Sequence, residues 1–244
     1  MKKSYAAIGG RFEYLNSDCG YEQWSQYLIK TLAELGAGTV GVDIGCGNGY
    51  FTRALCREGK SMLGVDISPE MLSAAEDIAR RQGIRAEFLL GDITKLKLTS
   101  RADFAIAIND CLNYVPQNKL HAAFSHVAGC LKKGGAFVFD ISTEYKLSKI
   151  LGDNMFADDE DDIAYIWFNK FEGDRVVMDI TVFTQTESGL FKREDERHVQ
   201  YVHRREDVVA ALESAGFEVV RAEGHLGVPL SDDSQRMNFI CVRR

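Results

Sequence analysis

Apolar residues in the first 142 positions fall into short, nearly continuous runs that are separated by amphipathic segments. Strands that are apolar on both faces are typical of a parallel sheet covered by helices on each side. Each run is therefore predicted to be a buried strand. The runs are TVGVDI (39–44), SMLGVDI (61–67), IRAEFLLGD (84–92), ADFAIAIND (102–110) and AFVFDI (136–141).

The segments between these runs carry apolar residues at helical spacing. The clearest follows the second run, because Ser68 can cap a helix that starts with Pro69 and stops at Gly83. Strands that alternate with helices through right-handed crossovers form a doubly wound α/β sheet. The predicted helices are 21–35, 50–58, 68–83 and 116–135.

After Ser142 the pattern changes to strict alternation of apolar and polar residues. Segments 160–173, 174–189 and 190–203 are predicted strands, which indicates an antiparallel sheet with one wetter side. The acidic run DDEDD (158–162) is predicted to be a solvated loop. One face of the second strand is apolar and consists of Val176, Met178, Ile180 and Val182.

The end of the chain returns to the first sheet, through a predicted helix at 205–216 and strands at 217–224 and 235–244. The predicted fold class is α/β, with a doubly wound, mostly parallel seven-stranded sheet and helices on both faces. A small antiparallel β insert lies between the fifth strand and the last helix. The predicted domains are 1–153 with 204–244, and the insert at 154–203.

Charge and composition limit the kinds of molecule that the protein is expected to bind. The 244 residues carry a formal net charge of -7 without a Lys/Arg block, so nucleic acid and anionic membranes are not expected partners. No run approaches the roughly 18 apolar residues of a membrane span, and the N-terminus lacks the apolar core of a signal peptide. The six cysteines are scattered without zinc spacing, so they are expected to be free thiols in a cytoplasmic protein.

The glycine-rich turn VDIGCGNG (42–49) lies between a predicted strand and a predicted helix, where NAD, FAD or S-adenosylmethionine (SAM) could bind. In the dinucleotide pattern G-x-G-x-x-G/A, Gly45 and Gly47 would place Tyr50 where a small residue is needed. Asp43 would also repel a pyrophosphate at the helix N-terminus. A cofactor with a cationic end, such as SAM, fits better.

This turn and three later motifs resemble those of the class I SAM-dependent methyltransferases. LGVDIS (63–68) resembles their second motif, in which Asp66 would bind the ribose hydroxyls. GDI (91–93) resembles the third, in which Asp92 would bind the adenine amino group and Ile93 would lie beside the ring. AIND (107–110) resembles the fourth, beside the reactive methyl group. The cofactor is thus expected to be SAM and the product S-adenosylhomocysteine (SAH).

A narrower resemblance is to bacterial small-molecule methyltransferases, which carry an antiparallel β insert over the SAM site. It rests on the first helix, NDCLNY (109–114), the segment around His198, and LESAGF (212–217). The Tyr-Asp pair usual near their N-terminus is replaced by FEYL (12–15). The resemblance implies the cofactor-binding residues Tyr14, Trp24, Asp43, Gly45, Cys46, Gly47, Asp66, Ile67, Ser68, Met71, Gly91, Asp92, Ile93 and Asn109.

The residues that act on the acceptor are less well defined. Transfer to an amine needs a group that takes a proton, and the candidates are Asp110, Tyr114, Glu196 and His198. A solvated sheet face is the alternative for Glu196 and His198. Asp110, Asn113 and Asp140 could approach one another as metal ligands, but their spacing does not require it, and no metal is predicted.

The expected function is SAM-dependent methyl transfer to a small molecule, with nitrogen favoured over oxygen as the acceptor atom. NDCLNY lacks the Asn/Asp-Pro-Pro-Tyr/Phe signature of enzymes that methylate nucleobase amino groups. The expected assembly is a monomer or homodimer. Two rival functions remain open: methylation of RNA or protein, and a non-catalytic module that senses SAM.

Overall fold

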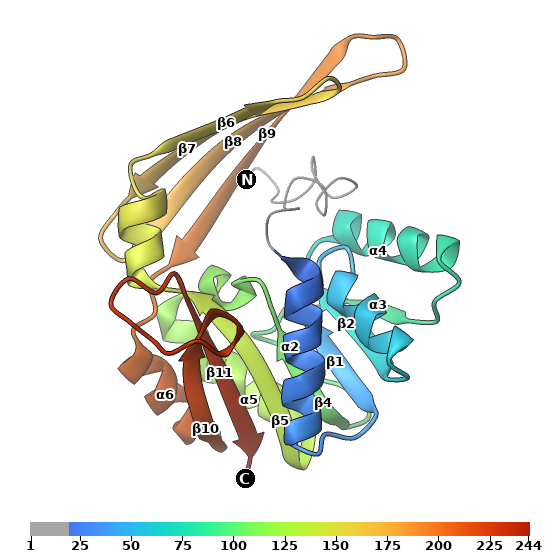
Figure 1. The fold of residues 1–244 in the computed structure, drawn as a ribbon, viewed down its shortest axis with the longest axis vertical. Helices are drawn as coiled ribbons and strands as arrows, with labels where there is room; N and C mark the ends of the chain where they lie inside the picture. Colours follow the sequence, from blue (N-terminus) through green and yellow to red (C-terminus); the bar gives the residue numbers. More distant parts are fainter. Residues whose placement is uncertain (1–19) are drawn as a thin grey trace.

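The computed structural model describes residues 20–244, which form two sheets (Figure 1). The larger sheet has seven strands in the order β10-β11-β5-β4-β1-β2-β3. Its pairs are parallel except where β11 runs antiparallel to β5 and β10, so the predicted fold class is confirmed. The strands are β1 (Val40–Ile44), β2 (Ser61–Asp66), β3 (Glu87–Leu90), β4 (Ala102–Ala107), β5 (Leu131–Ser142), β10 (Phe217–Gly224) and β11 (Arg236–Arg243).

Helices cover both faces of this sheet, because alternate side chains of its central strands point to opposite faces. Phe104 and Ile106 of β4 pack with α2 and α3, whereas Ala105 and Ala107 pack with α5 and α6. Two apolar cores result, one on each side. The helices are α2 (Tyr21–Glu34), α3 (Tyr50–Arg57), α4 (Pro69–Arg81), α5 (Leu120–Cys130) and α6 (Arg205–Ser214).

The strand order reverses between β1 and β4. The chain runs from β1 outward to β2 and β3, and then returns to place β4 on the other side of β1. The loops that leave β1 and β4 therefore diverge at the carboxyl edge of the sheet. Open α/β sheets bind their ligands at this kind of switch point.

The second sheet is antiparallel and curves over the carboxyl edge of the first (Figure 1). It has four strands rather than the predicted three. The prediction of a loop was wrong for the start of the acidic run, because Asp158 and Asp159 belong to an edge strand and their side chains point into solvent. The strands are β6 (Met155–Asp159), β7 (Ile163–Phe171), β8 (Arg175–Gln185) and β9 (Phe191–Tyr201).

Short helical elements connect the two sheets and differ from the predicted boundaries. The predicted helix 116–135 begins with the 3₁₀ turn η4 (Gln117–Lys119) and ends at Cys130, where β5 begins directly. A 3₁₀ turn, η3 (Cys111–Tyr114), follows β4, and a π-helix, η5 (Lys146–Leu151), leads into the second sheet. The 3₁₀ turn η6 (His225–Gly227) follows β10.

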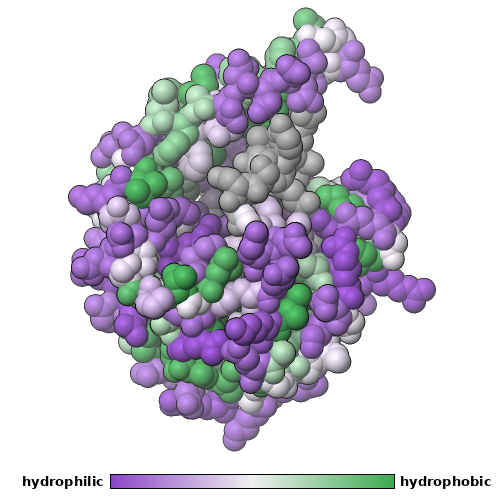
Figure 2. Space-filling view, viewed as in Figure 1, coloured by the Kyte–Doolittle hydropathy of each residue, from purple (hydrophilic) through white to green (hydrophobic). Residues whose placement is uncertain are grey.

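The surface of the protein is mostly polar, as expected for a chain with a formal net charge of -7 (Figure 2). Figure 2 shows a mostly hydrophilic face on which apolar residues form small, separate patches. Across residues 20–244 no helix is both long and apolar enough to cross a bilayer.

Candidate active site

A cavity of about 720 Å³ opens among the residues that end or follow β1, β2, β3 and β4. Its volume is in the range of sites that hold small-molecule cofactors. Twelve predicted site residues line it, although they come from segments far apart in the sequence. They are Gly45, Cys46, Gly47, Asp66, Ile67, Ser68, Met71, Gly91, Asp92, Ile93, Asn109 and Tyr114.

The glycine turn forms one wall of this cavity. Gly45 and Gly47 have φ values of 70° and 54°, in the left-handed region that favours glycine. A Cβ on Gly45 would lie 2.7 Å from the Cys111 side chain, so the turn packs tightly against the loop after β4. The turn is also tied to β2, because the Gly45 amide donates to the Val65 carbonyl at 2.7 Å.

Asp66, at the end of β2, holds both the glycine turn and the start of α4. Its carboxylate accepts hydrogen bonds from the Gly47 amide at 2.8 Å and the Ser68 amide at 2.9 Å. Burial raises the pKa of Asp66, and the backbone donors oppose that effect. Asp66 is thus an acceptor on the cavity wall, as a ribose-binding residue would have to be.

The rest of the lining fits an uncharged ring better than a phosphate. Ile67 is 71% exposed on the cavity wall, which is unusual for a large apolar side chain and provides a surface for a ring. Asp66, Glu70 and Asp92 make the wall acidic, and Lys119 is the only Lys or Arg among the described lining residues. The wall therefore suits SAM, which carries no phosphate, better than NAD or FAD.

Asp92 closes the turn after β3. Its Oδ1 accepts hydrogen bonds from the Thr94 amide at 2.8 Å and the Thr94 hydroxyl at 2.7 Å. Burial raises its pKa, but these bonds and the nearby Lys95 and Lys119 together outweigh burial and lower it overall. Asp92 is therefore ionised near neutral pH and can accept a further hydrogen bond.

Asp43 lies beneath the glycine turn instead of on the cavity wall. It is 1% exposed, and its Oδ2 accepts a hydrogen bond from the Thr52 hydroxyl at 2.6 Å. Burial raises the pKa of Asp43 to about 7. Asp43 would therefore attract the cationic end of a bound cofactor across the glycine turn, without touching it.

The first helix contributes a different aromatic residue from the one expected. Trp24 does not line the cavity, contrary to the prediction, because it is buried in the core with Leu28 and Phe51. Tyr21, one turn earlier, does line the cavity, and its ring lies 4.5 Å from that of Tyr50. The misfit of Tyr50 to the dinucleotide pattern indicates a large residue beside the turn, but no motif in the sequence indicates that Tyr21 lines the cavity. The predicted residue Tyr14 lies outside the described residues.

The turn after β4 has an unusual backbone. Asn109 and Asp110 have φ values of 65° and 54°, which are left-handed although neither residue is glycine. Their amides both donate to the buried Asp140 carboxylate, at 2.6 and 3.0 Å. Successive amides in such a conformation form an anion-binding concavity, and here a carboxylate of the protein fills it.

Asp110 belongs to the scaffold of this turn. Its carboxylate accepts hydrogen bonds from the Ser142 hydroxyl at 3.0 Å and the Gln200 amide at 2.8 Å, and Arg236 lies 3.4 Å away. Burial would raise its pKa, but Arg236, Lys146 and these bonds hold it below the usual range. Because Asp110 does not line the cavity, its position does not fit the predicted role of proton acceptor.

Asn113 and Arg236 complete the scaffold. The Asn113 amide donates to the Tyr201 carbonyl at 2.9 Å and to the Ser142 carbonyl at 3.1 Å, which joins η3 to β9 and β5. Arg236 bonds to Asp140 and donates to the Asn109 side chain at 2.9 Å. The polar atoms of Asp110, Asn113 and Asp140, which were considered as metal ligands, are thus bonded to other protein groups. Residues 20–244 contain no cluster of three His, Cys, Asp or Glu side chains that could hold a metal ion.

A chain of hydrogen bonds leads from the cavity wall into the second sheet. The Tyr114 hydroxyl lies 3.2 Å from Nδ1 of His198, and Nε2 of His198 lies 2.8 Å from the Glu196 carboxylate. His198 and Glu196 are each 2% exposed, so the solvated sheet face considered for them is wrong. The structure thus brings together three of the four residues predicted to act on the acceptor.

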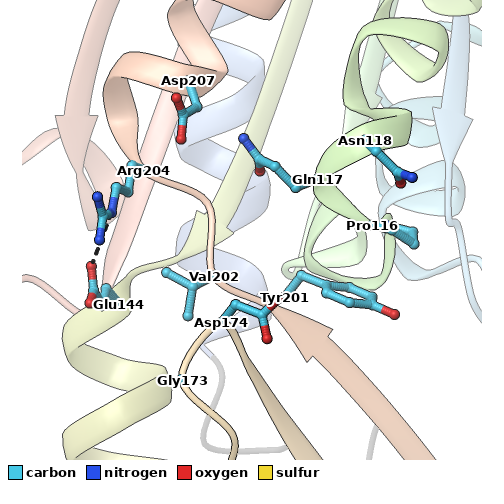
Figure 3. Close-up of a pocket in the computed structure, with 10 residues that line it drawn as sticks. All are labelled: Pro116, Gln117, Asn118, Glu144, Gly173, Asp174, Tyr201, Val202, Arg204 and Asp207. Atoms are coloured by element: carbon cyan, nitrogen blue, oxygen red, sulfur yellow. Dashed lines mark ion pairs between the residues drawn. The ribbon is translucent and has the colours of Figure 1, made fainter.

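A second cavity, of about 460 Å³, lies where the second sheet joins the first (Figure 3). It is lined by the β7–β8 turn, the end of β9, η4 and the start of α6, and Arg204 pairs with Glu144 at 3.9 Å across one side. None of the predicted site residues lines this second cavity. Pro116 borders both cavities, and no acidic or basic side chain among the described lining residues is shared between them. The larger cavity is therefore the candidate active site.

Comparisons with known proteins agree with this geometry. Residues 42–135, which include the glycine turn and Asp66, match the family model described as a methyltransferase domain. A protein named as a methyltransferase in Geobacillus sp. (strain WCH70) is 29% identical over 247 residues, covering 98% of this chain and 100% of the relative. The sugar N-methyltransferase KedS8 from Streptoalloteichus shares the fold, with a TM-score of 0.79 at 19% identity, over 100% of this chain and 94% of that one.

A solved S-adenosylmethionine-dependent methyltransferase from Clostridium acetobutylicum is similar over almost the whole chain. It is 31% identical, covers 95% of each chain, and superposes with a TM-score of 0.88. This similarity includes both sheets and is not limited to the matched domain. The chain therefore belongs to the S-adenosylmethionine-dependent methyltransferases.

Proposed function

We propose that this methyltransferase transfers a methyl group to the nitrogen of a small polar amine. The observation that carries the proposal is the hydrogen-bond chain from Tyr114, on the cavity wall, through His198 to Glu196. This chain begins where the acceptor would meet the cofactor and ends at a buried acid. It offers a route for the proton that an amine must lose.

SAM supplies a methyl group already activated by its sulfonium, and SAH is released. Such a displacement needs alignment and exclusion of water more than covalent help from the protein. In the proposed assignment Asp66 binds the ribose hydroxyls, Asp92 binds the adenine amino group, and Ile67 and Ile93 lie against the ring. The rings of Tyr21 and Tyr50 border the cavity and can shield a cationic sulfur.

The proton route depends on the tautomer of His198. Because the Glu196 carboxylate accepts from Nε2–H, Nδ1 can accept a proton from the Tyr114 hydroxyl. An ammonium acceptor can donate to the Tyr114 oxygen while the tyrosine proton moves to His198, and the imidazolium that forms is stabilised by Glu196. The acceptor nitrogen then has the lone pair that methyl transfer requires.

Charge on the second sheet favours nitrogen over oxygen. β9 places Glu194 and Glu196 on the same face as His198, and Lys192 on this face pairs with Glu194 at 2.9 Å. The buried Glu196 beside His198 is therefore the acid that favours a cationic amine over a carboxylate or phosphate. The nitrogen acceptor named for the sugar N-methyltransferase relative is consistent with this choice. In this assignment the insert, 154–203, is a lid that selects the acceptor, and Asp110 is a positioning residue that holds the turn beneath it.

The test is a panel of small amines, alcohols, phenols and thiols, each incubated with the enzyme and SAM. Mass spectrometry identifies the methylated atom, and SAH formation gives the rate. The proposal expects methylation on nitrogen for a subset of the amines. Transfer only to oxygen or sulfur would overturn it, as would transfer only to bulk RNA or protein, or SAM binding without any transfer.

A further inference from the structure

We propose that Arg236 is a positioning residue, which turns the Asn109 side chain so that its amide nitrogen donates a hydrogen bond to the carboxylate of the cofactor's amino-acid tail. This inference rests on the proposed function only in its placement of the ribose at Asp66 and the adenine at Asp92. It does not depend on which acceptor is methylated.

Asn109 lies on the cavity wall where β4 ends. It is half-buried and is one of the residues that line the larger cavity. Its backbone has a left-handed φ of 65°, and its amide donates to the Asp140 carboxylate at 2.6 Å. The backbone that carries this side chain is therefore held in place by a residue of the neighbouring strand β5.

Arg236 determines which end of the Asn109 side-chain amide faces away from the cavity. Nη2 of Arg236 donates to Oδ1 of Asn109 at 2.9 Å. A guanidinium has donors only, so the oxygen of the amide must be the end that faces it. Asp110 and Asp140 hold the guanidinium, and its side chain is 13% exposed. Arg236 is absent from the described lining of the cavity, so it would act on a ligand through Asn109.

The amide nitrogen of Asn109 is left as an open donor. It makes no hydrogen bond with residues 20–244, and it is not buried. Because the side chain lines the cavity, a ligand there can reach this nitrogen. Its partner is not the acceptor amine, since Arg236 occupies the amide oxygen that could accept an amine N–H. The lone pair of the amine, in turn, is needed for methyl transfer.

The cofactor supplies a suitable partner in this region. With adenine at the end of β3 and ribose at the end of β2, its amino-acid tail extends toward β1 and β4, because the strands lie in the order β4-β1-β2-β3. The tail carries an ammonium, which only donates, and a carboxylate, which only accepts. A hydrogen bond from an amide to a carboxylate is stronger than one between neutral groups.

The described lining offers no cation to this carboxylate at the β4 end. Lys119 is its only Lys or Arg, and it lowers the pKa of Asp92, which places it near the adenine end of the cavity. The described acidic residues of the wall would repel a carboxylate. Asn109 is thus the neutral donor that the tail would meet beside the turn after β4.

The test compares SAH with methylthioadenosine, which has the same adenosine and a thioether but no amino-acid tail. Both are titrated into the enzyme by calorimetry, and the readout is the ratio of their dissociation constants. Asn109→Gly deletes the amide, and glycine tolerates the positive φ at this position. The preference for SAH is expected to fall roughly tenfold, while methylthioadenosine affinity stays within about twofold of the wild type.

Asn109→Asp tests the same contact without deleting the side chain. It keeps the shape of the residue but presents an oxygen to the carboxylate, so the preference for SAH is expected to fall by more than roughly tenfold. Asn118→Asp makes the same substitution at an exposed position that does not line the larger cavity. This control is expected to keep the wild-type preference.

Arg236→Lys tests the positioning role. It keeps a positive charge beside Asp110 and Asp140 but lacks the planar fork of donors, so the Asn109 amide is no longer held in one orientation. The preference for SAH is expected to fall about fivefold. In an Asn109→Gly background the same change is expected to alter the preference by less than about twofold, because no amide is left to orient.

Three results would overturn the proposal. An unchanged preference in Asn109→Gly and Asn109→Asp would show that the amide does not bind the tail. Equal loss of affinity for both ligands would show that Asn109 serves only the turn. Independent effects of Arg236→Lys and Asn109→Gly would show that Arg236 does not act through the amide.

The assignments on which the proposal rests are tested separately. Asp66→Ala is expected to weaken both ligands alike, because both carry the ribose, so an error in the ribose assignment is seen in that variant. Methylation of amine nitrogen in the acceptor panel can be observed whether or not the preference depends on Asn109. An Asn109-dependent preference without any transfer to nitrogen would overturn the proposed function alone.

Discussion

The Tyr114 hydroxyl lies 3.2 Å from Nδ1 of His198, although 84 residues separate them in the sequence. Tyr114 belongs to η3, beside the cofactor cavity, and His198 belongs to β9 of the insert. The contact therefore joins the half of the protein that binds the cofactor to the half that is proposed to select the acceptor. In the proposed assignment, this pair carries the proton away from the acceptor amine.

Replacement of Asp66 tests the cofactor assignment. Asp66→Ala removes a half-buried acceptor that holds the Gly47 and Ser68 amides and would bind the ribose. SAM affinity measured by calorimetry is expected to fall by about 1–3 kcal/mol. Asp77→Ala, on the exposed side of α4, is the control and is expected to bind SAM like the wild type. Unchanged affinity in Asp66→Ala would refute the assignment.

Replacement of Gly45 tests the close packing of the glycine turn. Gly45→Ala adds a Cβ at a positive φ and 2.7 Å from Cys111, so we expect a loss of about 3 kcal/mol or more in unfolding free energy, together with loss of SAM binding. Gly36→Ala is the matched control, because Gly36 has a similar φ of +62° but no atom within 4 Å of the added Cβ. That variant should lose about 1–2 kcal/mol and keep its SAM affinity. Equal effects at the two positions would contradict the packing argument.

The buried Asp43 predicts how stability depends on pH. Its pKa is raised from 3.8 to about 7 in the folded protein, so the folded state binds the proton more tightly than the unfolded state does. This contribution to stability is present below about pH 4 and is lost as the pH rises through 7, up to about 4 kcal/mol.

The measurement is urea unfolding of the wild type and Asp43→Asn between pH 4 and 8. The amide of this variant would still accept the Thr52 hydrogen bond but cannot ionise, so stability of the wild type relative to the variant is expected to fall across this interval. A difference that stays constant with pH would show that Asp43 ionises normally.

Most of the fold could be predicted from local patterns. Buried parallel strands are continuous apolar runs, and each predicted run forms a strand in the larger sheet. β6 was missed because it is an edge strand whose acidic side chains face solvent, so its sequence resembles a loop. The early end of α5 was also missed, because the strand that follows begins with Leu131-Lys132-Lys133, which lacks a strand pattern.

The candidate site was predictable only in part. Residues at the ends of β1, β2 and β3 belong to short motifs, so the sequence indicates them directly. Arg236 could not be found this way, because it reaches Asp110 and Asp140 only through the antiparallel last strand, which starts at the carboxyl edge of the sheet. Trp24 was misplaced because a helical repeat does not say which aromatic residue faces a cavity and which faces the core.

The central claim is tested most directly by the rate of methyl transfer to an amine that the enzyme accepts, compared between the wild type and Tyr114→Phe at saturating SAM. The variant loses the hydroxyl that leads to His198, so kcat is expected to fall roughly 100-fold while SAM affinity stays the same. Tyr145→Phe, which lines neither cavity, serves as the control and is expected to keep the wild-type rate. A kcat in Tyr114→Phe within about twofold of the wild type would contradict the proposed proton route.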